Sequence, residues 1–124
     1  MAVNTERLFK LLNSRGVSGD ESEIRAAITE IVRPLCDDIT VDTMGNLFAH
    51  KKGSGKSNVR AMVCAHMDEV GLIVSWFRDD GLLEYDTVGG IDPRVLVSKR
   101  VKIGKNNVPG VIGAKAIHLQ SEAE

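Results

Sequence analysis

Apolar residues at helical spacing open the chain. Leu8, Leu11 and Leu12 fall on one face of a helix predicted over residues 5–12, with Thr5 as its N-terminal cap. The stretch "SRGVSGD" then interrupts the pattern. The sequence therefore begins with one short amphipathic helix that ends before residue 14.

A second and stronger helical pattern follows. Asp20 is the predicted cap, Glu23 stands three residues further on as in a capping box, and Pro34 marks the end. The apolar residues of this helix recur at a spacing of three and four: Ile24, Ala27, Ile28, Ile31 and Leu35.

After Cys36 the apolar residues alternate with polar ones, which predicts strands. A hairpin is expected from residues 39–42 and "LFAHKK", joined by the turn "MGN". The run "VRAMVCA" is apolar on both faces and predicts a strand buried inside a sheet. Short strands separated by glycine, asparagine and aspartate turns are expected at residues 70–77, 82–88, 100–103 and 108–117.

The change from a helical to a β-rich pattern predicts an α/β fold in two parts. Residues 1–71 are expected to form a portion of an α/β domain, and residues 72–124 a portion of a β-rich domain. A boundary near Gly71 or Leu72 fits this shift.

Composition excludes several classes of partner. Sixteen basic residues stand against seventeen acidic ones, for a net charge of −1, so nothing favours binding to nucleic acid or to an anionic membrane. No apolar run approaches the length of a membrane span. Cys36 and Cys64 lie far apart and form no CxxC pair, which is typical of reduced thiols in a cytoplasmic protein.

The stretch "VCAHMDEVG" carries the candidate chemistry. If residues 58–66 are extended, Cys64, His66 and Asp68 tend to one side of the chain. A histidine at the end of a strand can give one ring nitrogen to a metal ion while its other N–H donates to a carboxylate. His66 is thus a candidate metal ligand, and Asp68 a candidate for orienting it.

Two observations weigh against a complete metal site. A His-x-Asp pair at a strand end is also the pattern of an ordinary surface hydrogen bond, and a catalytic zinc ion needs three protein ligands. The other candidates are poor, because His50 is expected on a solvated strand, His118 lies close to the last residue, and Cys64 is expected to be a buried thiol. Any site formed by this chain alone is therefore expected to be incomplete.

Five sequence segments, in this order along the chain, carry a resemblance to a known family: "GVSGDESEIR", "DTMGNLFAHKKG", "VCAHMDEVGLIV", "GGIDPRVL" and "GVIGAKAIHL". Together they resemble the tetrahedral-aminopeptidase family of metallopeptidases, which includes glutamyl and deblocking aminopeptidases and some members called cellulases. The resemblance covers nearly the whole chain. It implies a cytoplasmic enzyme that removes N-terminal residues from peptides, usually as a homo-oligomer.

By this resemblance, His66 matches the first metal-ligand histidine of the family and Asp68 the carboxylate that orients it. Glu69 also matches the motif, without an assigned role. The family fold implies an α/β peptidase lobe with an inserted β-barrel-like domain that begins shortly after this motif. The implied cofactors are two divalent ions, zinc or cobalt.

The resemblance also implies that most of the active site is missing. The bridging aspartate, the glutamate pair with the general base and the remaining ligands of the family have no counterparts in these 124 residues. The leading hypothesis is an inactive N-terminal fragment of an aminopeptidase. The rival hypothesis is a non-enzymatic assembly module whose interface lies between Leu72 and Leu119.

Overall fold

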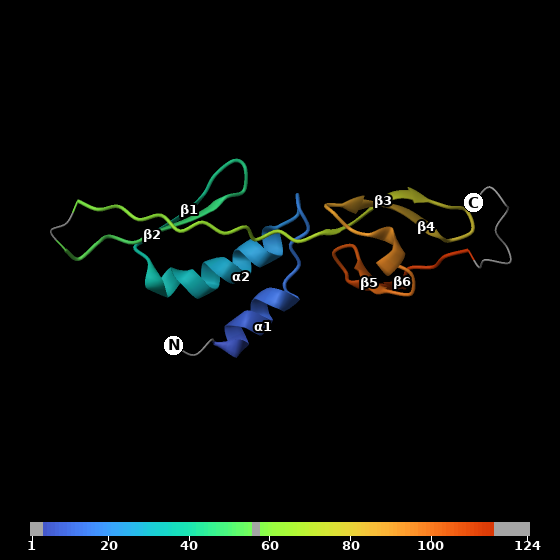
Figure 1. Cartoon of the computed structure of the whole chain (residues 1–124), viewed down its shortest axis with the longest axis horizontal. Helices are drawn as coiled ribbons and strands as arrows, with labels where there is room; N and C mark the ends of the chain where they lie inside the picture. Colours follow the sequence, from blue (N-terminus) through green and yellow to red (C-terminus); the bar gives the residue numbers. More distant parts are fainter. Residues whose placement is uncertain (1–3, 56–57, 116–124) are drawn as a thin grey trace. The chain divides into compact units, whose positions relative to one another are not determined.

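A computed structural model describes residues 4–55 and 58–115, and shows a small α/β arrangement of helices and antiparallel hairpins (Figure 1). The chain divides into two compact units, one ending at Gly89 and one starting at Gly90. The elements of the first unit are α1 (Thr5–Asn13), α2 (Ser22–Val32), η1 (Arg33–Leu35), β1 (Asp38–Val41), β2 (Leu47–His50), β3 (Gly71–Phe77) and β4 (Leu83–Val88). The second unit contains η2 (Pro93–Val95), β5 (Arg100–Ile103) and β6 (Val108–Val111).

The first helix is confirmed, but its cap is Asn4 and not the predicted Thr5. Asn4 has extended backbone angles, and its side chain accepts a hydrogen bond from the Arg7 N–H at 3.0 Å. Thr5 is already helical. Both residue types cap helices, and asparagine is the better of the two. The predicted first residue of the helix is therefore correct, and the predicted cap lies one residue too late.

The second helix is also confirmed, whereas its predicted capping box is wrong. Glu21 occupies the cap position and makes no side-chain cap bond. The Glu23 carboxylate instead accepts from the backbone N–H of Arg15 at 3.2 Å and from its guanidinium at 2.7 Å. The start of α2 is therefore held by the preceding loop. Pro34 falls in η1, directly after the last helical residue, as expected for a helix terminator.

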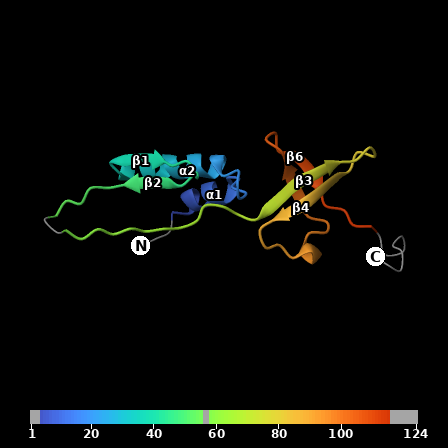
Figure 2. The same ribbon diagram turned by 90° about the horizontal axis from the view of Figure 1, so that it is seen from above.

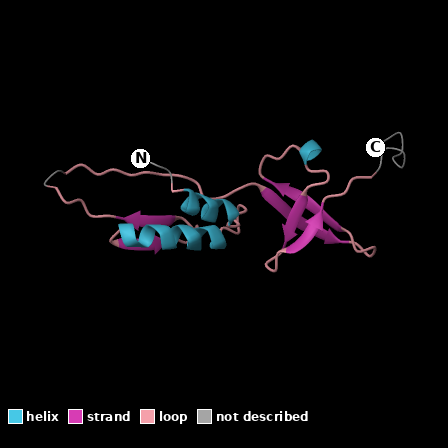
Figure 3. Cartoon of the chain, turned by 90° about the horizontal axis from the view of Figure 1, so that it is seen from below, coloured by secondary structure: helices cyan, strands magenta, loops and turns pink. Residues whose placement is uncertain are grey.

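The predicted β1–β2 hairpin is confirmed, with Asp38 opposite His50 and Val41 opposite Leu47. Its turn places Gly45 at φ +86°, which a residue without a Cβ adopts readily. Helix α2 lies alongside this hairpin (Figures 2 and 3). The Arg25 guanidinium joins the two elements by donating to the Gly45 carbonyl at 2.7 Å.

The β-rich part consists of two further hairpins. β3 pairs with β4 in the first unit, and β5 pairs with β6 in the second, both antiparallel. These strands match the predicted ranges, except that β6 ends at Val111, well short of the predicted residue 117. Residues 116 and 117 of that prediction lie outside the described ranges. A closed barrel is not formed by the described strands, which pair two by two.

The predicted buried strand "VRAMVCA" is not a strand. Residues 59–65 have no regular secondary structure, and Met62 and Val63 are 84% and 96% exposed. Cys64, expected to be a buried thiol, is exposed as well. The apolar pattern is that of a central strand, but a strand of this kind needs neighbours on both edges, and the described residues provide none here.

Few side chains form a core. Among the described residues, the buried apolar side chains are Ile24 and Ala27 of α2 and Ile112 of the second unit. None of the described helices has the length and apolar character needed to cross a lipid bilayer.

Candidate metal-ligand site

His66 and Asp68 lie between the extended segment 59–65 and strand β3, and their side chains meet. The Nδ1 atom of His66 is 3.1 Å from Oδ1 of Asp68 and 3.0 Å from the Asp68 backbone carbonyl oxygen. The imidazole side chain is 85% exposed and the Asp68 side chain 41%. The ring is therefore held on one side only.

The second oxygen of the Asp68 carboxylate has a different partner. The hydroxyl of Ser18 donates to Oδ2, so residues fifty positions apart meet at this carboxyl group. The Ser18 hydrogen bond, followed by the one from His66, holds the pKa of Asp68 below its usual range. Asp68 is therefore ionised at neutral pH.

An ionised Asp68 fixes the state of the neutral imidazole ring. A carboxylate can only accept hydrogen bonds, so Nδ1 must carry the proton that points at it. The Nε2 atom then has a free lone pair directed away from the carboxylate. An exposed imidazole with a carboxylate behind it is the arrangement in which histidines bind metal ions in proteins.

The remaining candidates do not join this pair. His50 ends β2 and is exposed, and Cys64 is an exposed thiol on the extended segment. His118 lies outside the described residues. Within residues 4–55 and 58–115, no three His, Cys, Asp or Glu side chains are grouped as metal ligands. The donors present thus fit one metal ligand and its orienting carboxylate, and they do not fit a complete metal site.

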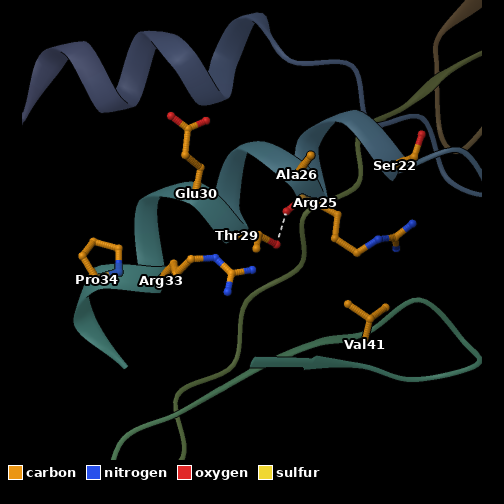
Figure 4. Close-up of a pocket in the computed structure, with 8 residues that line it drawn as sticks. All are labelled: Ser22, Arg25, Ala26, Thr29, Glu30, Arg33, Pro34 and Val41. Carbon is orange, nitrogen blue, oxygen red and sulfur yellow. Dashed lines mark hydrogen bonds between the residues drawn. The ribbon is translucent and has the colours of Figure 1, made fainter. Parts of the chain in front are cut away.

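Two hollows border helix α2. The smaller, of about 260 Å³, has His66 on its wall together with Gly16, Ile24 and Glu69. The larger, of about 620 Å³, lies between α2 and the β1–β2 hairpin. Figure 4 shows Arg25 and Arg33 on its wall and Val41 across from them. The larger hollow contains neither His66 nor Asp68, so its size does not make it the candidate site.

Comparison with known proteins decides the family. Residues 45–124 match the family described as M42 glutamyl aminopeptidase, and this range is more than half of the chain. The chain belongs to the M42 family. Membership implies a peptidase-related protein and the use of divalent metal ions, and the range of the match includes His66 and Asp68.

Individual M42 relatives agree over nearly the whole chain. A lysyl aminopeptidase of Pyrococcus furiosus is 36% identical over 125 aligned positions, which cover 98% of this chain and 35% of the relative. The Pyrococcus horikoshii TET1 peptidase, described as able to assemble into a tetrahedron or a large octahedral shell, is 37% identical with a TM-score of 0.77. That match covers 95% of this chain and 35% of the peptidase.

A third match carries a different name. A structure described as an endoglucanase from Thermotoga maritima is 42% identical with a TM-score of 0.76, over 86% of this chain and 33% of that one. A name of this kind was expected from the resemblance. The chain spans about a third of the length of the relatives that it matches.

The sequence pattern found the His66–Asp68 pair but missed Ser18. Side chains at positions i and i+2 of an extended segment lie on one side, so the pair follows from local spacing. Ser18 meets Asp68 only through the folding of two distant segments. The available signal was its presence in "GVSGDESEIR", one of the five family blocks.

Proposed function

We propose that this chain supplies the His66 part of a metal-dependent aminopeptidase that removes N-terminal residues from peptides. The observation that carries the proposal is the hydrogen bond from Nδ1 of His66 to Asp68, which leaves Nε2 of a largely exposed ring free. Family membership supports the same assignment. His66 is then a metal ligand and Asp68 the group that orients it.

In such an enzyme, divalent ions, zinc or cobalt, would supply Lewis-acid polarisation of the peptide carbonyl and a nucleophile at neutral pH. The residues of this chain would do the preparatory work. His66 would bind through Nε2, and Asp68 would keep the ring in the required tautomer and orientation.

The chain by itself is proposed to be inactive. One imidazole cannot hold two metal ions, and the described residues group no further ligands around it. The proposed organisation is a portion of an α/β peptidase domain over residues 1–71 and a portion of an inserted, barrel-like β-rich domain over residues 72–124. A cytoplasmic location is proposed from the two free cysteines, Cys36 and Cys64.

Self-association is the second candidate role, and it does not require activity. Strand β3 carries exposed aromatic side chains, Trp76 and Phe77, within the segment that the assembly hypothesis names. The TET1 peptidase, which shares this part of its fold, is described as forming large shells. An apolar hairpin surface of this kind favours contact with another copy of the chain.

The metal proposal is tested with the other described histidine as a control. We expect Co²⁺ to broaden the ring resonances of His66 at lower concentration than those of His50, because only His66 has a carboxylate behind its ring. His66→Gln should abolish the early broadening, and His50→Gln should not. Broadening of His50 first, or of both equally, would refute the assignment of His66.

A parallel assay tests the activity of the chain alone. With aminoacyl p-nitroanilides and added Zn²⁺ or Co²⁺, we expect no turnover above that of the free metal ion. Turnover that His66→Gln abolishes would show that these 124 residues are a sufficient enzyme.

A further inference from the structure

The loop before α2 docks onto the segment that carries His66. The Glu69 N–H donates to the Gly16 carbonyl at 2.7 Å, and the Ser18 N–H donates to the Glu69 carbonyl at 3.4 Å. Val17 and Glu69 thereby form a parallel β-bridge. The first and third family blocks are thus joined by backbone hydrogen bonds.

Two glycines allow this close approach. A Cβ on Gly16 would lie 2.7 Å from Cγ2 of Ile24 and 3.1 Å from the Met67 carbonyl oxygen. A Cβ on Gly71 would lie 2.5 Å from Cγ2 of Val17. Both distances to side-chain carbons are below the range that real Cβ atoms show, so these segments pack closely only because the two positions lack side chains.

A tight turn then presents Ser18 to the motif. The Asp20 N–H donates to the Val17 carbonyl at 2.8 Å, and Gly19 has φ +93°. This is a type II turn, with Ser18 at its second position and glycine at the position that requires positive φ. The turn fixes the backbone of Ser18, whose hydroxyl donates to Oδ2 of Asp68.

The two carboxylate oxygens of Asp68 therefore have separate partners, Ser18 on Oδ2 and His66 on Oδ1. Rotation of the carboxylate about its Cβ–Cγ bond breaks the bond to Ser18. Without that bond, the carboxylate is no longer tied to the loop before α2, and the Asp68–His66 contact becomes one of several accessible geometries. Alignment of the imidazole thus depends on a residue that does not touch it.

We propose that Ser18 is a positioning residue of the His66 site. Its hydroxyl locks the Asp68 carboxylate, and the locked carboxylate keeps the proton of His66 on Nδ1 so that Nε2 is presented to a metal ion. The inference rests on the proposed function of His66 as a ligand and adds a third member to the pair.

The test measures the tautomer of His66 in the metal-free 124-residue chain. Ring nitrogen shifts are recorded by NMR in mildly alkaline buffer, and the two tautomers of the neutral ring are distinguished by which ring nitrogen carries the proton. Wild-type His66 is expected to be mainly the Nδ1–H form. In Ser18→Ala the Nε2–H form should become the major one, and Ser18→Thr, which keeps the hydroxyl, should restore the wild-type spectrum.

Ser22→Ala is the matched control. Ser22 is also an exposed serine of the same region, and its hydroxyl donates to Asp20 at 3.2 Å, not to Asp68. The amide resonance of Glu69 reports whether the docked loop survives each substitution. If Ser18→Ala disturbs the Glu69 resonance, Ser18→Cys replaces it as the test variant, because cysteine keeps the side-chain size and is a much weaker donor. The same change in the His66 tautomer is then expected.

The outcomes separate this inference from the proposed function. An unchanged Nδ1–H form in Ser18→Ala, with the loop intact, overturns the role of Ser18 while leaving His66 as a ligand. A wild-type ring mainly in the Nε2–H form overturns the inference and the orientation by Asp68 together. If the tautomer changes in Ser18→Ala but Co²⁺ does not broaden the His66 resonances, Ser18 positions the ring and the metal proposal fails.

Discussion

At the scale of single residues, Asp68 is the group on which the candidate site depends. Its carboxylate is held by Ser18 and in turn holds the His66 ring. We predict that Asp68→Ala weakens Co²⁺ binding at His66 about tenfold, because loss of an orienting carboxylate typically has an effect of this order. A Co²⁺ titration followed by His66 line broadening measures this change.

Glu69→Gln provides the control for that experiment. Glu69 is adjacent and exposed, and its structural contacts to the loop run through backbone atoms, so Co²⁺ binding should be unchanged. If both substitutions weaken binding equally, the effect is one of net charge and Asp68 has no special part.

A second carboxylate, Asp42, closes the β1–β2 turn and makes the hairpin sensitive to acid. Donation from the Asn46 side chain, and then from the backbone N–H groups of Asn46, Met44 and Gly45, holds the pKa of Asp42 below its ordinary value of 3.8. The unfolded state then binds more protons than the folded state in this range. The carboxylate therefore contributes stability above about pH 3.8, which is lost as the pH falls through the lower pKa of the folded chain.

We expect the Asn46 amide shifts to titrate with a midpoint below pH 3.8 and the hairpin to loosen there. NMR of Asn46 against pH measures both effects. Asp42→Ala should abolish the titration and weaken the hairpin at neutral pH. A midpoint at or above the ordinary value would mean that the turn hydrogen bonds do not favour the ionised carboxyl group.

At the scale of elements, the two possible caps of α1 give different predictions. Asn4→Ala should destabilise the helix by about 1 kcal/mol, because the Arg7 N–H loses its acceptor. Thr5→Ala should have little effect, since the Thr5 side chain caps nothing. Helical content measured by circular dichroism distinguishes the two substitutions, and a larger loss in Thr5→Ala would restore the cap predicted from the sequence.

Elements defined by local signals were predictable, and those that need distant partners were not. The β3–β4 hairpin follows from alternation on either side of Asp80 and Gly81, where Gly81 adopts φ +84°. The strand predicted around Met62 is not formed, because a buried strand is defined by the strands on either side of it. Ser18 was missed for the related reason that no local pattern connects position 18 with position 68.

At the scale of the whole molecule, the described chain exposes apolar surface that a stable domain would cover. Its buried apolar side chains, Ile24, Ala27 and Ile112, are divided between two units, and burial of this kind is the main source of folding stability. The same residues span only about a third of the length of the chain's relatives. We therefore expect a broad thermal transition and binding of hydrophobic dyes.

The exposed segment 59–65 should also drive self-association, and two methionines allow a matched test. Met62 and Met44 are both 84% exposed, but Met62 lies in an apolar run without strand neighbours, and Met44 lies in the polar turn of the β1–β2 hairpin. An apolar extended segment with unfilled edges pairs readily with other chains, and a charge within it opposes such pairing. Met62→Lys should thus shift sedimentation toward the monomer, whereas Met44→Lys, with the same change in charge, should shift it far less. Equal shifts would assign association to net charge. No shift with either lysine would assign it to another surface, for which the exposed aromatic side chains of β3 are the next candidates.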